Sequence, residues 1–455
     1  MMLTVILAFF LAVSAVSAND ANDTAMTGSD ASQMKLSSGN GMIGDNLQIG
    51  GENPTLTHVD STYNQLKLEN DNEKLSVLND EDNLSSAETF NGTAFSELQS
   101  KINSLNNGDV LDLTNNVTQN GASHITISKS ITINGNGITI DAKGKSRIFY
   151  INGGATVVLN NITFTNGYQR EDGGAIYNEN AKVTITGSQF IKNTISQNGG
   201  AINNKGTMNI AETCFIANKA SWDGGAIYNT GNINIADSYF INSTVNNGGG
   251  AIYNFESNMN ITHSNFINNI AGAIQSYSGG AIYNFYSNVN IACSNFIDNT
   301  ANRIDGGAIY NWGREINIVN SSFIANKAIT WDGGAISNYD GHMTITNSLF
   351  INNTARYGGA IYNRGNSNAE ITNCVFINNK ATEGNHAYTT DSQLVINDNW
   401  WDTNDPVWNN LIYGNKPSSY AVLNVNADNQ NSYQGCQESG QHNLPQSCTG
   451  QAFGS

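Results

Sequence analysis

The stretch GGAIYNTGNINIADSYFIN, which runs from Gly224 to Asn242, recurs with small changes along the middle of the chain. Gly-Gly-Ala followed by Ile begins at Gly173, Gly199, Gly224, Gly249, Gly279, Gly306, Gly333 and Gly358, so successive copies start 25 to 30 residues apart. Self-similarity at a nearly fixed period of this size indicates a solenoid, in which each repeat stacks on its neighbour. The repeat, rather than any single motif, therefore decides the fold.

The second half of the repeat has a constant length. In the quoted copy Ile235 is followed five residues later by Phe240, and this spacing is the same in all eight copies, with Ile after the Phe each time. Nearly all variation in length falls between the Phe and the next Gly pair, an interval of 8 to 13 residues. Apolar and polar residues alternate, and β-branched residues, Gly and Asn dominate, which excludes a helical repeat. We expect three short strands per repeat in fixed register and one variable loop.

Three strands in each turn of about 25 residues predict an all-β fold, a right-handed parallel β-helix, with coils about 4.8 Å apart. Equivalent residues then form columns, with the second Ile and the Phe stacked inside. Asn stands five residues after the first Gly in every copy, as at Asn229, and three residues after the Phe in all but one, where Ser243 replaces it. Stacked amides at these turns are expected to hydrogen-bond from coil to coil. Alternating segments before Gly173 add about three coils, so we expect about 11 in total.

The N-terminal residues indicate a secreted protein. Residues 3–16 form an apolar run too short to span a bilayer, and Val16-Ser17-Ala18 at its end is typical of a signal-peptide cleavage site. Residues 1–18 are therefore predicted to be a signal peptide, and the mature chain is expected to be secreted, or displayed on the cell surface, without a transmembrane segment. The residues that follow, up to residue 90, are polar and low in aromatic residues, which predicts a disordered leader.

Order is expected from residue 91. Phe95, Leu98 and Ile102 share one helical face behind a plausible N-cap at Thr93, so a short helix is predicted to cover the open edge of the first coil. The predicted segments are a signal peptide (1–18), a leader (19–90), the β-helix (91–400, with the Gly-Gly-Ala-Ile repeats at 173–384), a C-terminal cap and strand (401–427) and a Gln-rich tail (428–455).

The charge and the cysteines of the chain argue against two classes of protein, those that bind nucleic acid and those held together by a disulfide framework. The formal net charge is −17, charged residues make up only 13% of the chain and Lys and Arg do not cluster, which argues against binding to nucleic acid. Cys214, Cys293 and Cys374 lie at different offsets within the repeats and are expected to be small buried or half-buried residues rather than a disulfide framework. Cys436 and Cys448 in the tail could form a disulfide with each other.

Two acidic residues are the candidates for metal binding. Asp305 and Asp332 each precede a Gly pair on adjacent coils, which would let them share a calcium ion, the one cofactor that the sequence suggests. Asn198 and Gly248 occupy the same position in other copies, so the alternative, that Asp before Gly-Gly serves only the turn, is favoured. The carboxylates and basic residues do not assemble into a catalytic cluster, and the six His residues do not group together. No catalytic residue is assigned, and the protein is not expected to be an enzyme.

Aromatic residues form the candidate binding surface. Tyr stands at an outward-facing position after the Gly pair in most copies, including Tyr228, Tyr253, Tyr283 and Tyr310. Trp222 and Trp331 precede two of the Asp-Gly-Gly turns. A ladder of aromatic rings can bind glycans or a partner protein. The alternative is that stacked Tyr side chains only cover the sheet and stabilise it by packing.

Gly-Gly-Ala-Ile paired with Phe-x-x-Asn, as in Phe266-Ile267-Asn268-Asn269, resembles the repeat of polymorphic outer-membrane proteins. The chain is more similar to the adhesin-like surface proteins of methanogenic archaea, which carry Gly-Gly-Ala-Ile-Tyr-Asn coils, a lead-in like residues 131–137 and a closing motif like residues 399–406. The resemblance covers about residues 90 to 427 and implies a secreted, pectin-lyase-like β-helix on the cell surface that attaches to glycans or proteins of other cells. Polysaccharide lyases and hydrolases share this fold, so an enzyme of that class is the alternative function.

Overall fold

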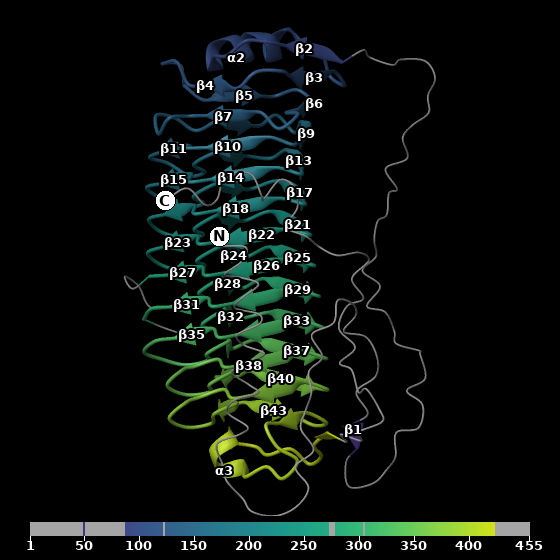
Figure 1. Cartoon of the computed structure of the whole chain (residues 1–455), viewed down its shortest axis with the longest axis vertical. Coiled ribbons are helices and arrows are strands. Elements are labelled where there is room, and N and C mark those ends of the chain that lie inside the picture. The colour runs from purple at the N-terminus through teal and green to yellow at the C-terminus, as the bar shows by residue number, and fades with distance from the viewer. Residues whose placement is uncertain (1–48, 51–86, 122, 273–277, 304, 424–455) are drawn as a thin grey trace, which may run out of the picture.

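Parallel strands wind around one axis in the computed structural model, which describes residues 49–50, 87–121, 123–272, 278–303 and 305–423. The coils stack into a rod, with the N-terminal coils at the top of Figure 1 and the C-terminal coils at the bottom. The fold is the predicted all-β, right-handed parallel β-helix. The predicted signal peptide (1–18) and the Gln-rich tail (428–455) lie outside the described residues.

Each coil contributes strands to three long sheets and, along much of the rod, to a short fourth one, and every strand pairs in parallel with its equivalents in neighbouring coils. We name these the Asn, Phe, Tyr and lobe sheets. The Asn sheet contains β2 (Glu88–Phe90), β3 (Val110–Leu113), β6 (Ile131–Asn134), β9 (Thr156–Asn160), β13 (Lys182–Thr186), β17 (Thr207–Ala211), β21 (Asn232–Ala236), β25 (Asn258–Thr262), β29 (Asn288–Ala292), β33 (Glu315–Val319), β37 (His342–Thr346), β40 (Asn368–Thr372) and β43 (Gln393–Val395). The Phe sheet contains β4 (Val117–Thr118), β7 (Thr139–Asp141), β10 (Thr163–Thr165), β14 (Gln189–Ile191), β18 (Cys214–Ile216), β22 (Tyr239–Ile241), β26 (Asn265–Ile267), β30 (Asn295–Ile297), β34 (Ser322–Ile324), β38 (Leu349–Ile351), β41 (Val375–Ile377) and β44 (Trp400–Trp401).

The other two sheets follow in each coil. The Tyr sheet contains β5 (Ile125–Ile127), β8 (Phe149–Ile151), β12 (Ile176–Asn178), β16 (Ile202–Asn204), β20 (Ile227–Asn229), β24 (Ile252–Phe255), β28 (Ile282–Phe285), β32 (Ile309–Trp312), β36 (Ile336–Tyr339), β39 (Ile361–Arg364), β42 (Ala387–Thr390) and β45 (Ile412–Tyr413). The lobe sheet contains β11 (Tyr168–Gln169), β15 (Thr194–Ile195), β19 (Lys219–Ala220), β23 (Thr244–Val245), β27 (Ile270–Ala271), β31 (Thr300–Ala301) and β35 (Lys327–Ala328).

The interior of the rod consists of columns of like residues, as predicted. In the Asn sheet Ile235 pairs with the equivalent Ile of the coil on either side. In the Phe sheet the centroids of the Phe215 and Phe240 rings are 4.6 Å apart and the rings are almost parallel, and the stack runs from Phe164 to Phe376. These side chains are fully buried or nearly so. Each coil therefore offers the next the same apolar contacts, which is why the motif recurs in the sequence.

Both predicted Asn columns are buried and hydrogen-bonded from coil to coil. The Nδ2 of Asn229 donates to the Oδ1 of Asn254 at 2.7 Å, and the Nδ2 of Asn204 donates to the Oδ1 of Asn229 at 2.7 Å. In the column that follows the Phe, the Nδ2 of Asn269 donates to the Oδ1 of Asn299 at 3.0 Å. A buried amide without partners costs roughly 1–3 kcal/mol. The columns avoid that cost because each amide is a partner for its neighbours.

The Gly pair is required where the chain enters the Tyr sheet. Gly224 has φ +66°, a left-handed conformation that other residues adopt only with strain. A Cβ on the following residue, Gly225, would lie 2.0 Å from the carbonyl oxygen of Gly250 in the next coil. The second Gly therefore permits the close approach of successive coils.

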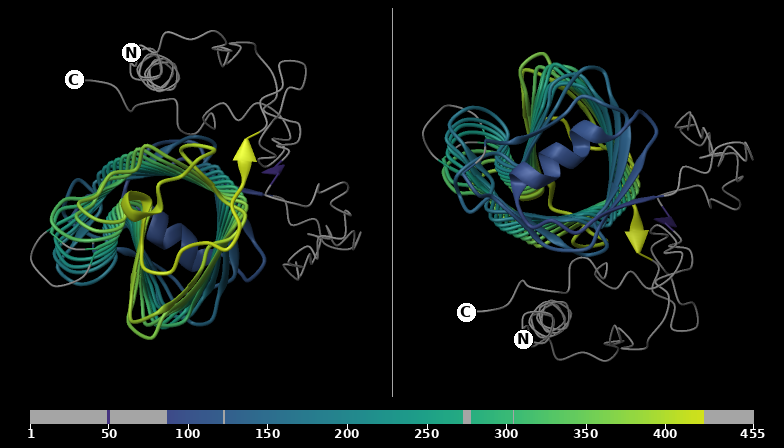
Figure 2. Two further views of the ribbon diagram at one scale, coloured as in Figure 1. Left: turned by 90° about the horizontal axis from the view of Figure 1, so that it is seen from below. Right: turned by 90° about the horizontal axis from the view of Figure 1, so that it is seen from above.

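The variable loop is partly ordered into strands, whereas the sequence predicted three strands per coil and an irregular loop. Its first residues form the lobe sheet, whose two-residue strands pair in register although the loops differ in length. Ile195, Ala220, Val245 and Ala271 form a small buried cluster inside this lobe. Seen along the axis, the lobe is the stack of loops beside the main body of the rod (Figure 2). Two alternating residues are too short a pattern to recognise in a sequence.

The rod is slightly longer than the predicted 11 coils or so, since the Asn sheet has 13 strands. One additional repeat begins at Gly384, where Gly-Asn-His-Ala-Tyr replaces Gly-Gly-Ala-Ile-Tyr and pairs in register with the coil before it. His386 is larger than the Ala it replaces, and Ala387 is smaller than the Ile, so the core volume is roughly kept. Further along, Trp401 continues the Phe stack with its ring 4.4 Å from that of Phe376.

Helix α2 (Phe95–Ser104) covers the N-terminal end of the rod, as predicted (Figure 2). The N-cap residue is Ala94 and not Thr93; the carboxylate of Glu97 accepts the backbone N–H of both. Because β2 precedes the helix and pairs with β3, order begins before the boundary expected at residue 91.

At the C-terminal end, α3 (Trp408–Leu411) and β45 follow the last coils, and the two-residue strand β46 (Val422–Leu423) lies in the segment predicted to hold a terminal strand. Strand β46 pairs antiparallel with β1 (Ile49–Gly50), which belongs to the predicted leader. In the described part of the chain, no helix is long and apolar enough to span a membrane.

The cysteines differ from the prediction. Cys374 is free and fully buried, as expected, but Cys214 and Cys293 are disulfide-bonded. Cys214 precedes the inward-facing Phe215, so its side chain points to the outside of the Phe sheet, where a second sulfur can reach it. The predicted pair of Cys436 and Cys448 lies outside the described residues.

Candidate functional site

The Tyr column points away from the core of the rod, as predicted, but most of it is not available for binding. The side chains of Tyr253, Tyr283 and Tyr310 are 9%, 6% and 0% exposed, and Tyr228 is partly exposed. The chain that leaves the lobe covers them: a Cβ on Gly248 would lie 2.2 Å from the Tyr283 ring.

Ring geometry in the middle of the Tyr column also differs from a flat binding ladder, although the Tyr228 and Tyr253 rings stack nearly parallel at 5.3 Å. The Tyr253 and Tyr283 rings meet edge to face at 4.8 Å, and the Tyr283 and Tyr310 rings do so at 5.1 Å. They pack with Phe255 and Phe285 in one cluster. The column therefore stabilises the contact between the lobe and the Tyr sheet, which is the packing alternative.

The structure brings the predicted acidic pair together: the side chain of Asp305 contacts the backbone of Asp332. Asp305 and Asp332 are 4% and 2% exposed, and the Oδ1 of Asp305 accepts the backbone N–H of Asp332 at 3.2 Å. Asn198 accepts the backbone N–H of Asp223 in the same way at 3.1 Å. A carboxylate and an amide thus make the same contact at these two turns, so the contact does not require a charge.

Burial makes these carboxylates costly to ionise. It raises the pKa of Asp305 to about 7, with a smaller contribution from the charge of Asp332. It also raises the pKa of Asp332, to about 6, while the nearby Arg364 acts in the opposite direction. Calcium takes about six to eight oxygen ligands. Among the described residues, no group of three or more His, Cys, Asp or Glu side chains is placed to hold a metal ion.

Trp222 and Trp331 are exposed, by 56% and 45%, on the rim where the chain leaves the lobe. They occupy equivalent positions in coils that are four steps apart in the lobe sheet, so they are separated by about 19 Å along the rod. Ile329 beside Trp331 is also exposed, by 48%. We call these three residues the Trp rim.

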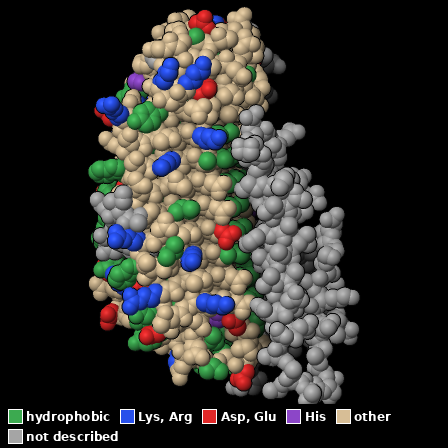
Figure 3. Space-filling model, turned by 60° about the vertical axis from the view of Figure 1, so that its left-hand side comes forward, with side chains coloured by type: hydrophobic (Ala, Val, Ile, Leu, Met, Phe, Trp, Pro, Cys, Tyr) green, Lys and Arg blue, Asp and Glu red, His purple; other side chains and the backbone are tan. Residues whose placement is uncertain are grey.

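A cation lies next to the C-terminal half of the Trp rim. The guanidinium carbon of Arg356 is 6.0 Å from the centroid of the Trp331 ring and 4.8 Å from that of the Tyr357 ring. The backbone N–H of Arg356 donates to the carbonyl of Trp331 at 2.7 Å, which ties the two coils together. An exposed Trp supported in this way is a rigid apolar surface with a cation at its edge. Figure 3 shows the lobe side of the rod, with Lys and Arg side chains along its whole height and apolar side chains between them.

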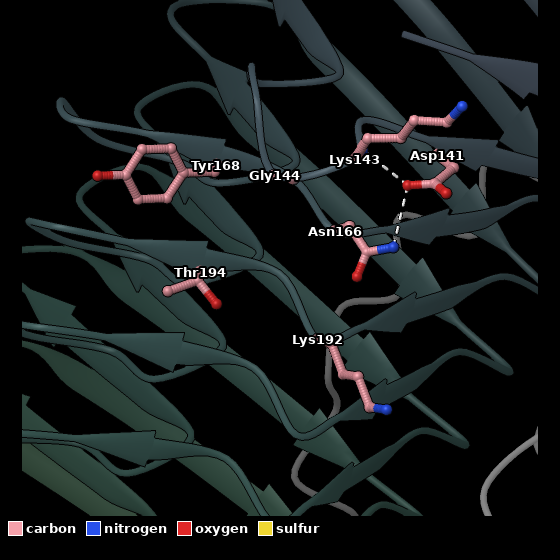
Figure 4. Close-up of a pocket in the computed structure, with 8 residues that line it drawn as sticks. Asp141, Lys143, Gly144, Asn166, Tyr168, Lys192 and Thr194 are labelled. Atoms are coloured by element: carbon pink, nitrogen blue, oxygen red, sulfur yellow. Dashed lines mark hydrogen bonds between the residues drawn. The ribbon is translucent and has the colours of Figure 1, made fainter.

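The sequence did not predict a concave site near the start of the lobe, which we call the notch. It has a volume of about 670 Å³ and is lined by Asp141, Lys143, Gly144, Asn166, Gly167, Tyr168, Lys192 and Thr194. Figure 4 shows Tyr168 on one side and Asp141 with Asn166 on the other. The signal that could have found it is Asp-Ala-Lys-Gly-Lys at 141–145, where two lysines flank a Gly just before the regular repeats begin.

Comparison with known proteins relates the repeats to one family. The Chlamydia polymorphic membrane protein repeat matches residues 212–230 and 347–364, each of which contains a Phe-x-x-Asn turn, the lobe loop and a Gly-Gly-Ala-Ile-Tyr-Asn strand. No curated protein matches the chain. A solved structure of alginate lyase AlyF-OU02 in complex with G6 is similar, with 14% identity and a TM-score of 0.43 over 77% of this chain and 90% of that one. At that level of similarity, it says nothing about activity. The repeat match, together with the rod, indicates a surface-exposed β-helix protein.

Proposed function

We propose that this protein is a secreted, adhesin-like protein of the cell surface that attaches to glycans or proteins of other cells through the Trp rim. The observation that carries the proposal is the pair of exposed Trp side chains, Trp222 and Trp331, at equivalent positions of the rod. Trp is among the residues that most often anchor a binding interface. Two such rings at a fixed separation can bind a repetitive partner more tightly than one can.

The match to polymorphic membrane protein repeats supports a surface location. A surface location also agrees with the signal peptide predicted at 1–18, since such a segment directs the chain out of the cytoplasm and is then removed. An intact-mass measurement on the secreted protein, which should begin near Asn19, tests this part of the proposal.

The experiment is a binding measurement with the purified mature chain on glycan arrays and on whole cells. Trp222→Ala and Trp331→Ala are each expected to weaken binding about tenfold, and the double variant to abolish it. Tyr413→Ser is the matched control, because Tyr413 is as exposed as Trp331 but lies in the last strand of the Tyr sheet. Equal loss in the control, or undiminished binding by the double variant, would refute the Trp rim. New reducing or unsaturated ends released from a polysaccharide would instead favour the enzyme alternative.

A further inference from the structure

We propose that the notch binds an acidic sugar residue, meaning a sugar that carries a carboxylate, sulfate or phosphate group. This inference rests on the proposed function, since it names the class of glycan that the rod would hold. It concerns a different surface, because the notch lies at the first strand of the lobe and the Trp rim lies where the chain leaves it.

The notch exists because the lobe begins abruptly. In the coil before β11, the chain passes from the Phe sheet to the Tyr sheet by a tight turn at Lys143 and Gly144, both in the left-handed conformation with φ of 52° and 67°. One coil later the connection lengthens and forms the first lobe strand at Tyr168. The short turn and the longer loop leave a step between them, and Gly144 and Gly167 line it without side chains.

The charged residues that line the notch are one carboxylate and two lysines. The carboxylate of Asp141 accepts the backbone N–H of Lys143 at 2.7 Å and the Nδ2 of Asn166 at 3.0 Å, so hydrogen bonds within the protein orient it (Figure 4). Lys143 and Lys192 are exposed, and neither forms an ion pair with a residue that the structure describes. Figure 4 shows both lysine side chains extending away from Tyr168, so their ammonium groups lie at the margin of the notch. The two lysines at this margin therefore favour an anionic ligand.

The walls of the notch fit a sugar better than a simple anion. The hydroxyl of Tyr168 is 3.2 Å from the Oγ of Ser196, which fixes the half-buried ring at the edge of the notch. A sugar ring presents an apolar C–H face to an aromatic ring and hydroxyl groups to side chains such as Asn166 and Thr194. Inorganic phosphate would use the lysines alone. A sugar with an acidic group would use the lysines, the ring and the polar side chains together.

The test is calorimetric titration of the purified mature chain with three oligosaccharides of equal length: an oligogalacturonate, a sulfated oligomer and a neutral cello-oligosaccharide. We expect binding of at least one acidic oligomer and little of the neutral one. Lys143→Gln and Lys192→Gln should each reduce the affinity for it roughly tenfold, since each removes a charge-assisted contact. Tyr168→Ala should weaken all residual sugar binding. The carboxylated and sulfated arms identify which acidic group is preferred.

Lys327→Gln is the matched control, because exposed Lys327 stands five lobe strands after Thr194 in the same column, far from the notch. Equal loss of affinity in this control, or equal binding of the neutral oligomer, would overturn the inference. If acidic oligomers do not bind while the Trp222 and Trp331 variants still impair attachment to another partner, the inference fails and the proposed function stands. If neither surface binds anything, both fail. Unchanged melting temperatures of the variants show that the rod is intact.

Discussion

Asp305 and Asp332 lie on adjacent coils, and the side chain of Asp305 accepts the backbone N–H of Asp332 at 3.2 Å. Asn198 makes the same contact to Asp223, so an amide oxygen can replace the carboxylate in this contact. A neutral amide at position 305 would therefore keep the contact to the backbone N–H of Asp332.

The first prediction follows from the raised pKa of Asp305. A carboxyl whose pKa is near 7 in the folded protein and near 3.8 when unfolded stabilises the fold at low pH, and that stability is lost as the pH rises through 7. Asp305→Asn should therefore stabilise the protein at pH 8, on the order of 2–4 kcal/mol, and change little at pH 4. Thermal unfolding as a function of pH measures the difference. The control is exposed Asp340→Asn, because Asp340 also accepts a backbone N–H, from Asn366 at 2.9 Å. A parallel pH response in both variants would contradict the prediction.

The second prediction compares two Asn columns. Asn254→Ala should cost about 2–4 kcal/mol, because Asn254 is fully buried and its loss breaks the column on both sides: Asn229 loses one of its acceptors and Asn284 loses its donor in the column. Asn260→Ala should cost less than about 1 kcal/mol, although Asn260 also donates to its neighbour, Asn234, at 2.8 Å. Water can replace the lost partner only at the second site, on the outer face of the Asn sheet. Urea unfolding curves of both variants measure the two losses of stability. Equal losses would mean that burial does not explain the contribution of the buried Asn column.

The third prediction concerns the close approach of coils. Gly225→Ala should prevent regular stacking, because the new Cβ would meet the carbonyl oxygen of Gly250 at 2.0 Å. Gly187→Ala is the control: Gly187 also has a positive φ, +58°, but a Cβ there has no atom within 4 Å. The control should cost only about 1–2 kcal/mol from the left-handed conformation. Yield of folded protein and the melting temperature report both effects, and a stable Gly225→Ala protein would show that the coils can move apart.

The fourth prediction concerns the cysteines. Cys374 is fully buried and burial raises the pKa of its thiol to about 12, so it should react with iodoacetamide only after unfolding. Cys214 and Cys293 are disulfide-bonded, but the strands next to them, β18 and β30, are three steps apart, about 14 Å. A disulfide bridges Cα atoms less than about 7 Å apart. Non-reducing peptide mapping should therefore find the two residues in different cross-linked peptides, and a direct bond between them would refute this reading.

Most of the fold could be predicted because stacking in register makes the same residue necessary at the same place in every coil. Ile235, Phe240 and Asn229 each belong to a buried column, and their fixed spacing specifies the strands and turns. The lobe sheet was missed since its strands have only two residues. The repeat at Gly384 was missed because His386 and Ala387 exchange large and small side chains while the core volume is kept.

The candidate site was less predictable. Alternation places Tyr253 and Tyr310 on the outer side of a strand, but it does not reveal that the lobe returns over them. Trp222 and Trp331 are exposed, whereas their use in binding stays a proposal. The notch forms because two successive loops differ in length and lie side by side in the structure. A local sequence motif does not reveal this arrangement.

Because the coils stack at a regular spacing, the number of coils between two surface residues sets the distance between them. Because each coil presents to the next the same columns that it receives, a whole coil can be inserted or removed without creating an unfamiliar interface. Each such event would change the distance between Trp222 and Trp331 by one step of about 4.8 Å, while the chemistry of both residues stays the same. Duplication or loss of repeats can therefore change the distance between the two Trp side chains without changing the side chains themselves.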